Sequence, residues 1–175
     1  MLLFRKNNSL AMERPILKIE LGPADMILEI LAIIILLVFF GFTLYQFSRL
    51  PETIPTHFNG SGVPDDYGSK YTLWVLPLIA LVIYAILSLV SRIPEKLNYP
   101  VKITPANARK QYILSIRLLR YLKLAVILMF FFISYQTTMI AQQKIAGLGP
   151  FFVPIYIGMI MIPVIVYYIL AQQSK

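Results

Sequence analysis

Residues Met26–Phe47 read MILEILAIIILLVFFGFTLYQF and decide the fold class. After Glu29 the chain continues for 19 residues without a charged side chain. A helix needs about 20 apolar residues to cross a hydrocarbon layer about 30 Å thick, so this stretch predicts a membrane-spanning helix. It is too long for a signal peptide, carries Glu29 at its start and lacks a small-residue cleavage pattern at its end. We therefore expect it to remain in the mature protein.

Three further charge-free stretches, of 21, 20 and 30 residues, follow later in the 175-residue chain. Because hydrocarbon offers no hydrogen-bond partner to a free amide, each stretch must be helical where it crosses the bilayer. The sequence predicts an all-α membrane protein, a single integral membrane domain over residues 1–175 with four transmembrane helices. The predicted spans are residues 26–47, 72–91, 124–141 and 151–171, with an outer loop at 48–71 and a cytoplasmic loop at 92–123.

The composition excludes several classes of protein. Hydrophobic residues make up 58% of the chain, charged residues 14%, and cysteine is absent. These values exclude a disordered chain, a disulfide scaffold, a thiol enzyme and a zinc site built on thiolates. The spans contain almost no ionisable side chain, so we expect no buried acid–base set of the kind that ion transporters use. Glu29, near the inner end of the first span, is expected to reach water.

Lys and Arg are unevenly distributed between the two sides of the predicted membrane. The net charge of +8 alone would fit a nucleic-acid-binding protein. However, 13 of the 16 basic residues lie before the first span, between the second and third spans, or at the C-terminus. Basic residues accumulate on the cytoplasmic side of membrane proteins, so we expect both termini there. We expect these residues to meet membrane lipids and not nucleic acid.

The cytoplasmic loop contains a helix-start signal. Thr104 can cap a helix, Pro105 suits its first position, and no proline or glycine follows before Gly147. This predicts one helix from Pro105 to Ala141, about 55 Å long at 1.5 Å per residue, with the third span extended into the cytoplasm. Its basic residues fit a solvated stem, a contact with lipid headgroups or a docking surface for a cytoplasmic regulator. The candidates are Arg109, Lys110, Arg117 and Arg120.

Two short stretches ahead of ascending helices suggest extended structure. Leu17–Leu21 reads LKIEL and Tyr99–Ile103 reads YPVKI. We expect them to pair as a small two-stranded sheet on the cytoplasmic face, packed against the helices because such a pair is marginal alone.

The outer loop holds most of the polar chemistry on its side of the membrane. Leu50–Lys70 reads LPETIPTHFNGSGVPDDYGSK, with three prolines, three glycines and the only histidine of the chain. Proline fixes φ and glycine permits tight turns, so the loop is expected to be shaped and not slack. The residues expected to bind a ligand or to structure the loop are His57, Asn59, Asp65 and Lys70.

Three chemical interpretations of this loop remain open. Ser61 or Ser69 with His57 and Asp65 would supply the residue types of an acyl-transfer site. His57, Asp65 and Asp66 would supply weak candidates for a divalent metal site. In the third interpretation, which we favour, the side chains are structural: His57 and Asn59 hydrogen-bond turn amides, and Asp65 or Asp66 pairs with Lys70. This interpretation is compatible with binding, because shaped loops on rigid scaffolds often bind partners. We expect no catalytic residue, no resident metal and no cofactor.

The loop also resembles a known family. Together with the apolar span that follows, it looks like the signature of a bacterial multi-pass membrane family defined by a domain of unknown function, the domain found at the front of SdpI-like immunity proteins. A second block, Asn98–Pro105 with the stretch Arg117–Arg120, is also similar to this family. The residues that carry the first match are Pro55, His57, Phe58, Asn59, Gly62, Asp65, Gly68 and Lys70.

The resemblance implies a role in immunity or signalling. SdpI-like proteins protect a producing cell from a secreted toxic peptide and can hold a transcriptional repressor at the membrane, but they are longer, with further helices after this domain. We expect a bacterial cytoplasmic (inner) membrane protein, starting at Met1 or Met12, that is not an enzyme. Its leading function is binding, immunity or signalling through residues 50–70, with an extracytoplasmic peptide or membrane protein as partner. The alternative is an accessory subunit of a larger complex or transporter, and the third interpretation is a membrane-bound hydrolase or metal-binding protein.

Overall fold

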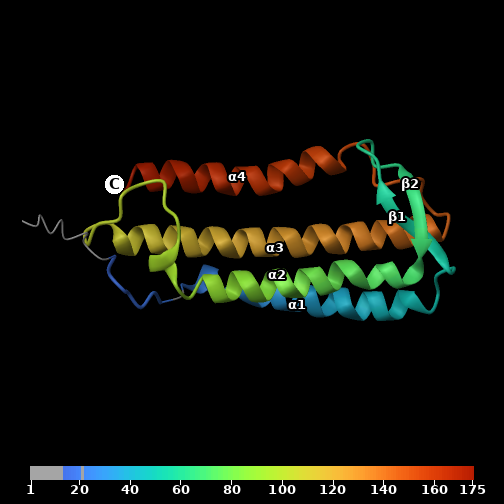
Figure 1. Ribbon diagram of the computed structural model, residues 1–175, viewed down its shortest axis with the longest axis horizontal. Helices are drawn as coiled ribbons and strands as arrows, with labels where there is room; N and C mark the ends of the chain where they lie inside the picture. The colour runs from blue at the N-terminus through green and yellow to red at the C-terminus, as the bar shows by residue number, and fades with distance from the viewer. Residues whose placement is uncertain (1–13, 21) are drawn as a thin grey trace, which may run out of the picture.

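The computed structural model describes residues 14–20 and 22–175 and shows long helices lying side by side along one axis (Figure 1). A β-hairpin covers one end, which we call the hairpin end. Residues 14–20, loop 91–107 and the C-terminus lie at the other end, which we call the basic end. The elements in chain order are α1 (Pro23–Phe47), β1 (Thr53–Phe58), β2 (Pro64–Ser69), the 3₁₀ helix η1 (Lys70–Trp74), α2 (Val75–Val90), the 3₁₀ turn η2 (Pro94–Lys96), α3 (Ala108–Ala141) and α4 (Phe152–Gln172).

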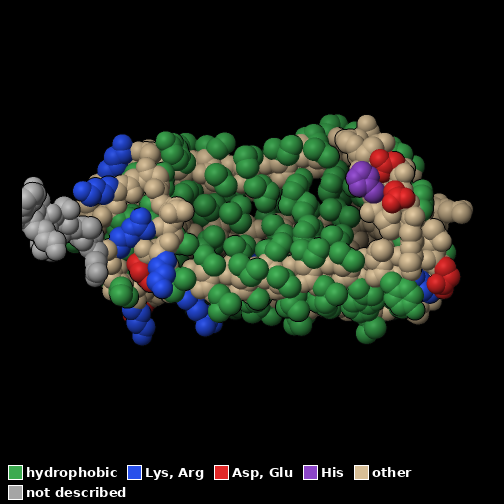
Figure 2. Space-filling view, in the orientation of Figure 1, with side chains coloured by type: hydrophobic (Ala, Val, Ile, Leu, Met, Phe, Trp, Pro, Cys, Tyr) green, Lys and Arg blue, Asp and Glu red, His purple; other side chains and the backbone are tan. Residues whose placement is uncertain are grey.

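Three of the four predicted spans correspond to helices that are long and apolar enough to cross a membrane. They are α1, the continuous segment Lys70–Val90 formed by η1 and α2, and α4. Apolar side chains cover the middle of the molecule, and charged side chains gather at its two ends (Figure 2). Such an apolar belt is expected where lipid replaces water as the solvent, which supports a membrane protein. The remaining predicted span, the third in chain order at residues 124–141, forms the second half of α3 and is not among these helices.

The third long helix begins later than predicted. We expected Pro105 at its first position, but α3 begins at Ala108 and continues for 34 residues. Before it, the backbone N–H of Thr104 donates to Asn107 Oδ1 (2.8 Å), and the N–H of Asn107 donates to Thr104 Oγ1 (3.3 Å). These reciprocal bonds form a separate turn ahead of the helix. The helix is still about 51 Å long, well beyond the thickness of a bilayer core.

The predicted sheet on the basic end is wrong. Of the described residues in Leu17–Leu21 and Tyr99–Ile103, none belongs to a strand, and the two-stranded sheet is formed by β1 and β2 in the predicted outer loop. The two stretches do meet, but through side chains that pack around Tyr112. The Tyr112 hydroxyl donates to the Pro15 carbonyl (3.1 Å), and Pro100 has no N–H to offer a ladder.

The buried core joins α1, α2 and α3. Ala32, Leu36 and Phe39 of α1 pack with Ala80 of α2 and Ile127 of α3. The two alanines are fully buried, and small residues of this kind let membrane helices approach closely.

The last helix is attached differently. Only Ala171 of α4 is buried, and the helix packs chiefly against α3. At its C-terminal end, Gln111 Nε2 donates to the carbonyls of Ala171 (2.9 Å) and Ser174 (3.1 Å), which fixes this end of α4 on α3.

Candidate functional site

The predicted outer loop folds into an antiparallel hairpin with a tight turn. The register pairs Thr53 with Ser69 and Phe58 with Pro64, and irregular pairing flanks His57. In the turn, Asn59 Oδ1 accepts the backbone N–H groups of Ser61 (2.9 Å) and Val63 (3.1 Å). Asn59, one of the predicted binding residues, therefore builds the turn.

Lys70 closes the other end of the hairpin. Its ammonium donates to Glu52 Oε1 (2.8 Å) and lies 5.2 Å from the centre of the Phe47 ring. Only 15% of the Lys70 side chain is exposed, against 81% for Glu52. Ile54 is buried with Leu50 beneath the sheet. Lys70 thus fixes the strands on the ends of the helices and is not free to bind a ligand.

The hairpin turn is also locked to the loop between α3 and α4. The Leu148 N–H donates to the Gly62 carbonyl (2.7 Å). Gly62 has a φ of +77°, a conformation that favours glycine. A Cβ on Gly147 would lie only 2.5 Å from the Gly62 oxygen, so the two segments touch backbone to backbone. The hairpin is therefore held at both of its ends.

Two of the predicted site residues come together on the open face of the hairpin. His57 Nδ1 lies 2.5 Å from Asp65 Oδ1 across the strands, and 68% and 42% of these side chains are exposed. Asp66, the next residue in β2, is not part of this pair and instead accepts a hydrogen bond from Thr56 Oγ1 (3.2 Å). His57 and Asp65 are the predicted hairpin residues that remain available to a partner.

The two competing interpretations of the loop gain no geometric support. Within residues 14–20 and 22–175, no three His, Asp or Glu side chains come together as metal ligands would. The Ser69 hydroxyl accepts the Tyr71 N–H (3.4 Å) at the start of η1. Among the hydrogen bonds of the described residues, none joins His57 to Ser61 or Ser69, so the contact that would activate a serine is missing there.

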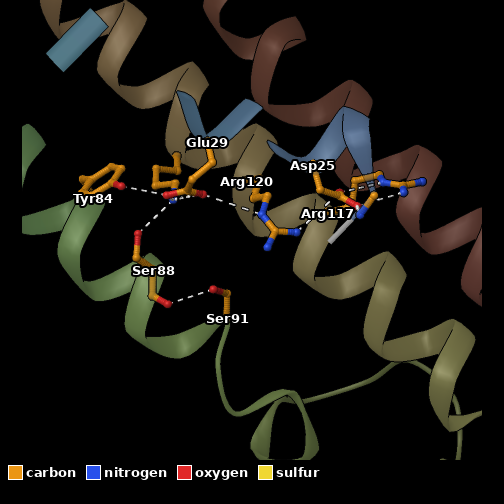
Figure 3. Close-up of polar contacts among 9 residues, drawn as sticks. Asp25, Glu29, Tyr84, Ser88, Ser91, Arg117 and Arg120 are labelled. Carbon is orange, nitrogen blue, oxygen red and sulfur yellow. Dashed lines mark hydrogen bonds and ion pairs between the residues drawn. The ribbon is translucent and has the colours of Figure 1, made fainter. Parts of the chain in front are cut away.

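A second cluster of polar side chains, at the basic end, was not predicted. The Lys123 ammonium donates to both carboxylate oxygens of Glu29 (2.7 and 2.8 Å) and to Ser88 Oγ (2.9 Å), as Figure 3 shows in part. The Tyr84 hydroxyl also donates to Glu29 (2.8 Å). Lys123 is only 2% exposed. Our expectation that Glu29 simply reaches water was therefore wrong, because α2 supplies Tyr84 and α3 supplies Lys123 as partners for its carboxylate.

The other half of this cluster joins Asp25 to two arginines of α3. Arg117 Nε lies 3.2 Å from Asp25 Oδ1, and Arg120 Nη1 lies 3.4 Å from the same oxygen. The hydrogen bond that Arg117 donates to Asp25 raises the pKa of Arg117, so that this guanidinium stays charged. Asp25 also accepts the Gly22 N–H (3.2 Å) at the start of α1. The pairs tie the first turns of α1 to the middle of α3 (Figure 3).

The expectation for the basic residues of α3 was half wrong. Arg109 and Lys110 are exposed, as a solvated stem requires. Arg120 is instead 9% exposed and points inward, and Arg117 is partly covered by its pairing with Asp25. Asp25 and Glu29 lie four residues apart on one face of α1. Their basic partners in α3 recur at every third position, at Arg117, Arg120 and Lys123. This matching spacing in two helices that begin at the same end is the signal that could have revealed the cluster.

Comparisons with known proteins cover the hairpin and its flanks. Residues 32–81 match the model of a family described as "Domain of unknown function (DUF1648)". This segment contains the second half of α1, the whole hairpin and the first turns of α2. The chain is also similar to an "Uncharacterized protein" of Archaeoglobus fulgidus, with 35% identity over 89 residues.

That similarity covers 46% of this chain and 47% of the relative, so the chain spans about half the length of the relative it matches. No solved structure matches the chain. Neither match carries the immunity role that the resemblance to SdpI-like proteins implies. The three long apolar helices suggest a membrane protein, and the match at residues 32–81 makes it similar around its hairpin to a domain family of unknown function.

Proposed function

We propose that the protein crosses a bacterial cytoplasmic membrane four times, with both termini in the cytoplasm and the hairpin outside. The added crossing is residues 124–141 of α3, which carry no charged side chain. Side chains of this segment pack against α1, α2 and α4, which supports a crossing beside the three helices that are apolar enough to span. The placement of 13 of the 16 basic residues at the basic end supports the orientation.

Reporter fusions test this topology. A fluorescent protein that folds only in the cytoplasm should be bright when fused after Lys175. Alkaline phosphatase, which folds only outside, should be active when inserted at Gly60 in the hairpin turn. The reverse pattern, or two ends on opposite sides, would refute the arrangement.

The hairpin acts as a non-enzymatic binding module for an extracytoplasmic peptide or membrane protein. The observation that carries this proposal is the exposed His57–Asp65 pair on a hairpin anchored at both ends. Shaped loops on rigid scaffolds bind partners without a large ordering cost. Within the described residues β2 pairs only with β1, which leaves its outer edge open for an extended peptide to add as a third strand. A secreted toxic peptide, as in the immunity proteins that the sequence resembles, is the partner that this mode favours.

A protection assay tests the immunity form of this proposal. Bacteria sensitive to the sporulation-delaying toxic peptide are made to express the wild-type chain or the double variant His57→Ala, Asp65→Ala. We expect protection by the wild type and its loss in the double variant, at equal levels in the membrane. Glu52→Gln, which alters the anchor and not the open pair, is the matched control and should still protect.

A crosslinking assay tests binding without assuming a toxin. A photoactivatable phenylalanine analogue replaces Tyr67, which is 57% exposed on β2, or Arg109 at the basic end as control. Crosslinks from position 67 that disappear in the His57→Ala, Asp65→Ala background would support a hairpin partner. Equal crosslinking from both positions, or none from position 67, would leave the hairpin a structural element.

A second candidate function is that of an accessory subunit in a larger membrane complex. Its supporting observation is an apolar groove of about 630 Å³ between α3 and α4 near the hairpin end. Aromatic side chains line it, and α4 has few other neighbours. A helix from a partner membrane protein would fill it. Stoichiometric co-purification in mild detergent that is lost when Met159 is replaced by tryptophan would favour this function, and a wild-type chain purified alone would favour the hairpin.

A further inference from the structure

A separate cavity opens beside the ion pairs at the basic end. It has a volume of about 530 Å³, within the roughly 300–1,000 Å³ of sites that bind small molecules. Residues 17–19 form one wall, and residues of α1, α2 and α3 form the others. Unlike the groove between α3 and α4, this cavity has several polar and charged side chains in its lining, beside apolar ones. The lining residues that matter for its chemistry are Lys18, Glu29, Ser88, Ser91, Arg92 and Arg120.

The charges around this cavity do not balance. Its lining holds three basic side chains and one carboxylate, that of Glu29. Both Glu29 oxygens already accept the Lys123 ammonium, and one also accepts the Tyr84 hydroxyl. Glu29 is therefore compensated from within the protein. The lining cations Lys18 and Arg92 are exposed, and neither forms an ion pair with another described residue. This excess of positive charge attracts an anion.

Arg120 is the buried member of this lining. Its side chain is 9% exposed, and its Nε lies 3.7 Å from Glu29 Oε2, too far for a hydrogen bond. Among the described residues this Nε–H has no hydrogen-bond partner, although buried N–H groups are nearly always paired. Figure 3 shows the Arg120 guanidinium between Glu29 and Asp25, on the side of the cluster that faces the end of α2. An arginine held in this way is a preformed donor for an oxyanion.

Two serines of α2 complete the polar wall. Ser88 Oγ accepts a hydrogen bond from Lys123 (2.9 Å) and also lines the cavity. Ser91 Oγ donates to the Ser88 carbonyl (2.8 Å), and Ser91 lines the cavity beside Arg92. Leu89 follows Ser88 and Ile93 follows Arg92 in the chain, and these two apolar side chains are 61% and 41% exposed. Polar donors thus lie directly beside apolar surface at the end of a membrane helix.

We infer that this cavity binds a phosphate group, held by Arg92, Arg120 and Lys18. Guanidinium groups match phosphate oxygens in pairs, and a lysine adds a point charge. The group has two chemical sources: the headgroup of an anionic lipid in the surrounding leaflet, or a soluble phosphate compound. The apolar surface formed by Leu89 and Ile93 favours the lipid, whose acyl chains would lie along α2. This inference does not depend on what the hairpin binds.

Native mass spectrometry of the full chain tests the inference. The protein is released from nanodiscs that contain phosphatidylcholine with phosphatidic acid, and in a separate arm its thermal unfolding in detergent is followed with inorganic phosphate. The test variant is Lys18→Gln, Arg92→Gln, which leaves the buried ion pairs intact. The matched control is Arg109→Gln, Lys110→Gln, which removes the same charge from exposed positions at the same end. We expect the wild type to retain phosphatidic acid about tenfold over phosphatidylcholine, a preference that falls about fivefold in the test variant and less than about twofold in the control.

The two arms separate the sources of the phosphate. Retention of phosphatidic acid without an effect of inorganic phosphate supports a lipid headgroup. Stabilisation by inorganic phosphate that the test variant loses supports a soluble phosphate ligand in the same cavity. Absence of both effects in the wild type, or an equal loss in the test and control variants, would overturn the inference, because the binding would then reflect only general surface charge.

Discussion

Replacing Lys123 by methionine tests the ion pairs that join α1 to α3. Methionine keeps most of the length and volume of the side chain but removes the ammonium that donates to Glu29 and Ser88. Because Lys123 is 2% exposed, water cannot take the place of the lost donor on its side of the pair. The change therefore leaves a carboxylate partly buried among apolar helices with its main partner gone.

The expected loss of stability follows from the geometry. Removal of one partner of a buried pair costs about 3–5 kcal/mol. Glu29, however, is 27% exposed and keeps the hydroxyl of Tyr84 at 2.8 Å and the guanidinium of Arg120 at 3.7 Å. These contacts compensate part of the loss, so we expect Lys123→Met to lower the free energy of unfolding by about 2–3 kcal/mol. Glu29→Gln with Lys123→Met should cost less than the two single changes together, with a coupling of about 1–3 kcal/mol.

Trp74 provides the readout. It is the only tryptophan of the chain, and its ring centre lies 6.4 Å from that of Phe40 and 6.2 Å from that of Phe47. Its fluorescence should report the separation of α1 from η1 as sodium dodecyl sulfate is added to the protein in mild detergent. A loss of less than about 0.5 kcal/mol in the free energy of unfolding for Lys123→Met would refute the reasoning, as would strictly additive effects of the single changes in the double variant. Either result is what an exposed surface ion pair would give.

Other positions give sharp contrasts. Gly147→Ala places a Cβ 2.5 Å from the Gly62 oxygen and should cost about 1–3 kcal/mol, whereas Gly60→Ala meets nothing within 4 Å and should stay within about 0.5 kcal/mol, both measured by the same unfolding assay. Asn59→Ala removes the acceptor of two turn amides and should cost about 1 kcal/mol, whereas His57→Ala should be nearly neutral; comparable costs would mean that the histidine also supports the fold. Burial raises the pKa of Tyr99 to about 12, so its contribution to stability is complete below pH 10 and is lost as the pH rises toward 12. In an ultraviolet titration of tyrosine ionisation, the Tyr99→Phe variant should differ from the wild type by one phenol only as the pH approaches 12. A difference that is already present near pH 10 would contradict the burial of Tyr99.

The helices could be predicted from the sequence because lipid imposes a simple rule on them. Charge-free length fixes a span, and the predicted span at residues 151–171 agrees with the helix α4, Phe152–Gln172, to one residue at each end. The start of α3 was less predictable. Thr104 and Asn107 bond to each other in a local turn, and a pattern that names only cap residues does not distinguish this turn from a helix start.

The hairpin and the ion pairs could not be predicted because they depend on contacts between distant segments. Pro55 and Pro64 suggest a loop, yet a proline is tolerated in a two-stranded sheet, where each strand has an open edge. The partner of Glu29 lies 94 residues away in Lys123, and finding it requires knowing which helices are neighbours and which faces meet. An isolated charge near the end of an apolar stretch is therefore ambiguous until packing supplies its counterion.

The bond between the Leu148 N–H and the Gly62 carbonyl has a mechanical consequence. It connects the turn of the hairpin to the loop between α3 and α4, so the hairpin cannot tilt independently of that loop. A force applied to the hairpin turn either breaks this hydrogen bond or displaces the loop with the turn. In the second case the force is transmitted to the adjoining ends of α3 and α4. A partner that binds the hairpin would therefore also act on the loop between α3 and α4.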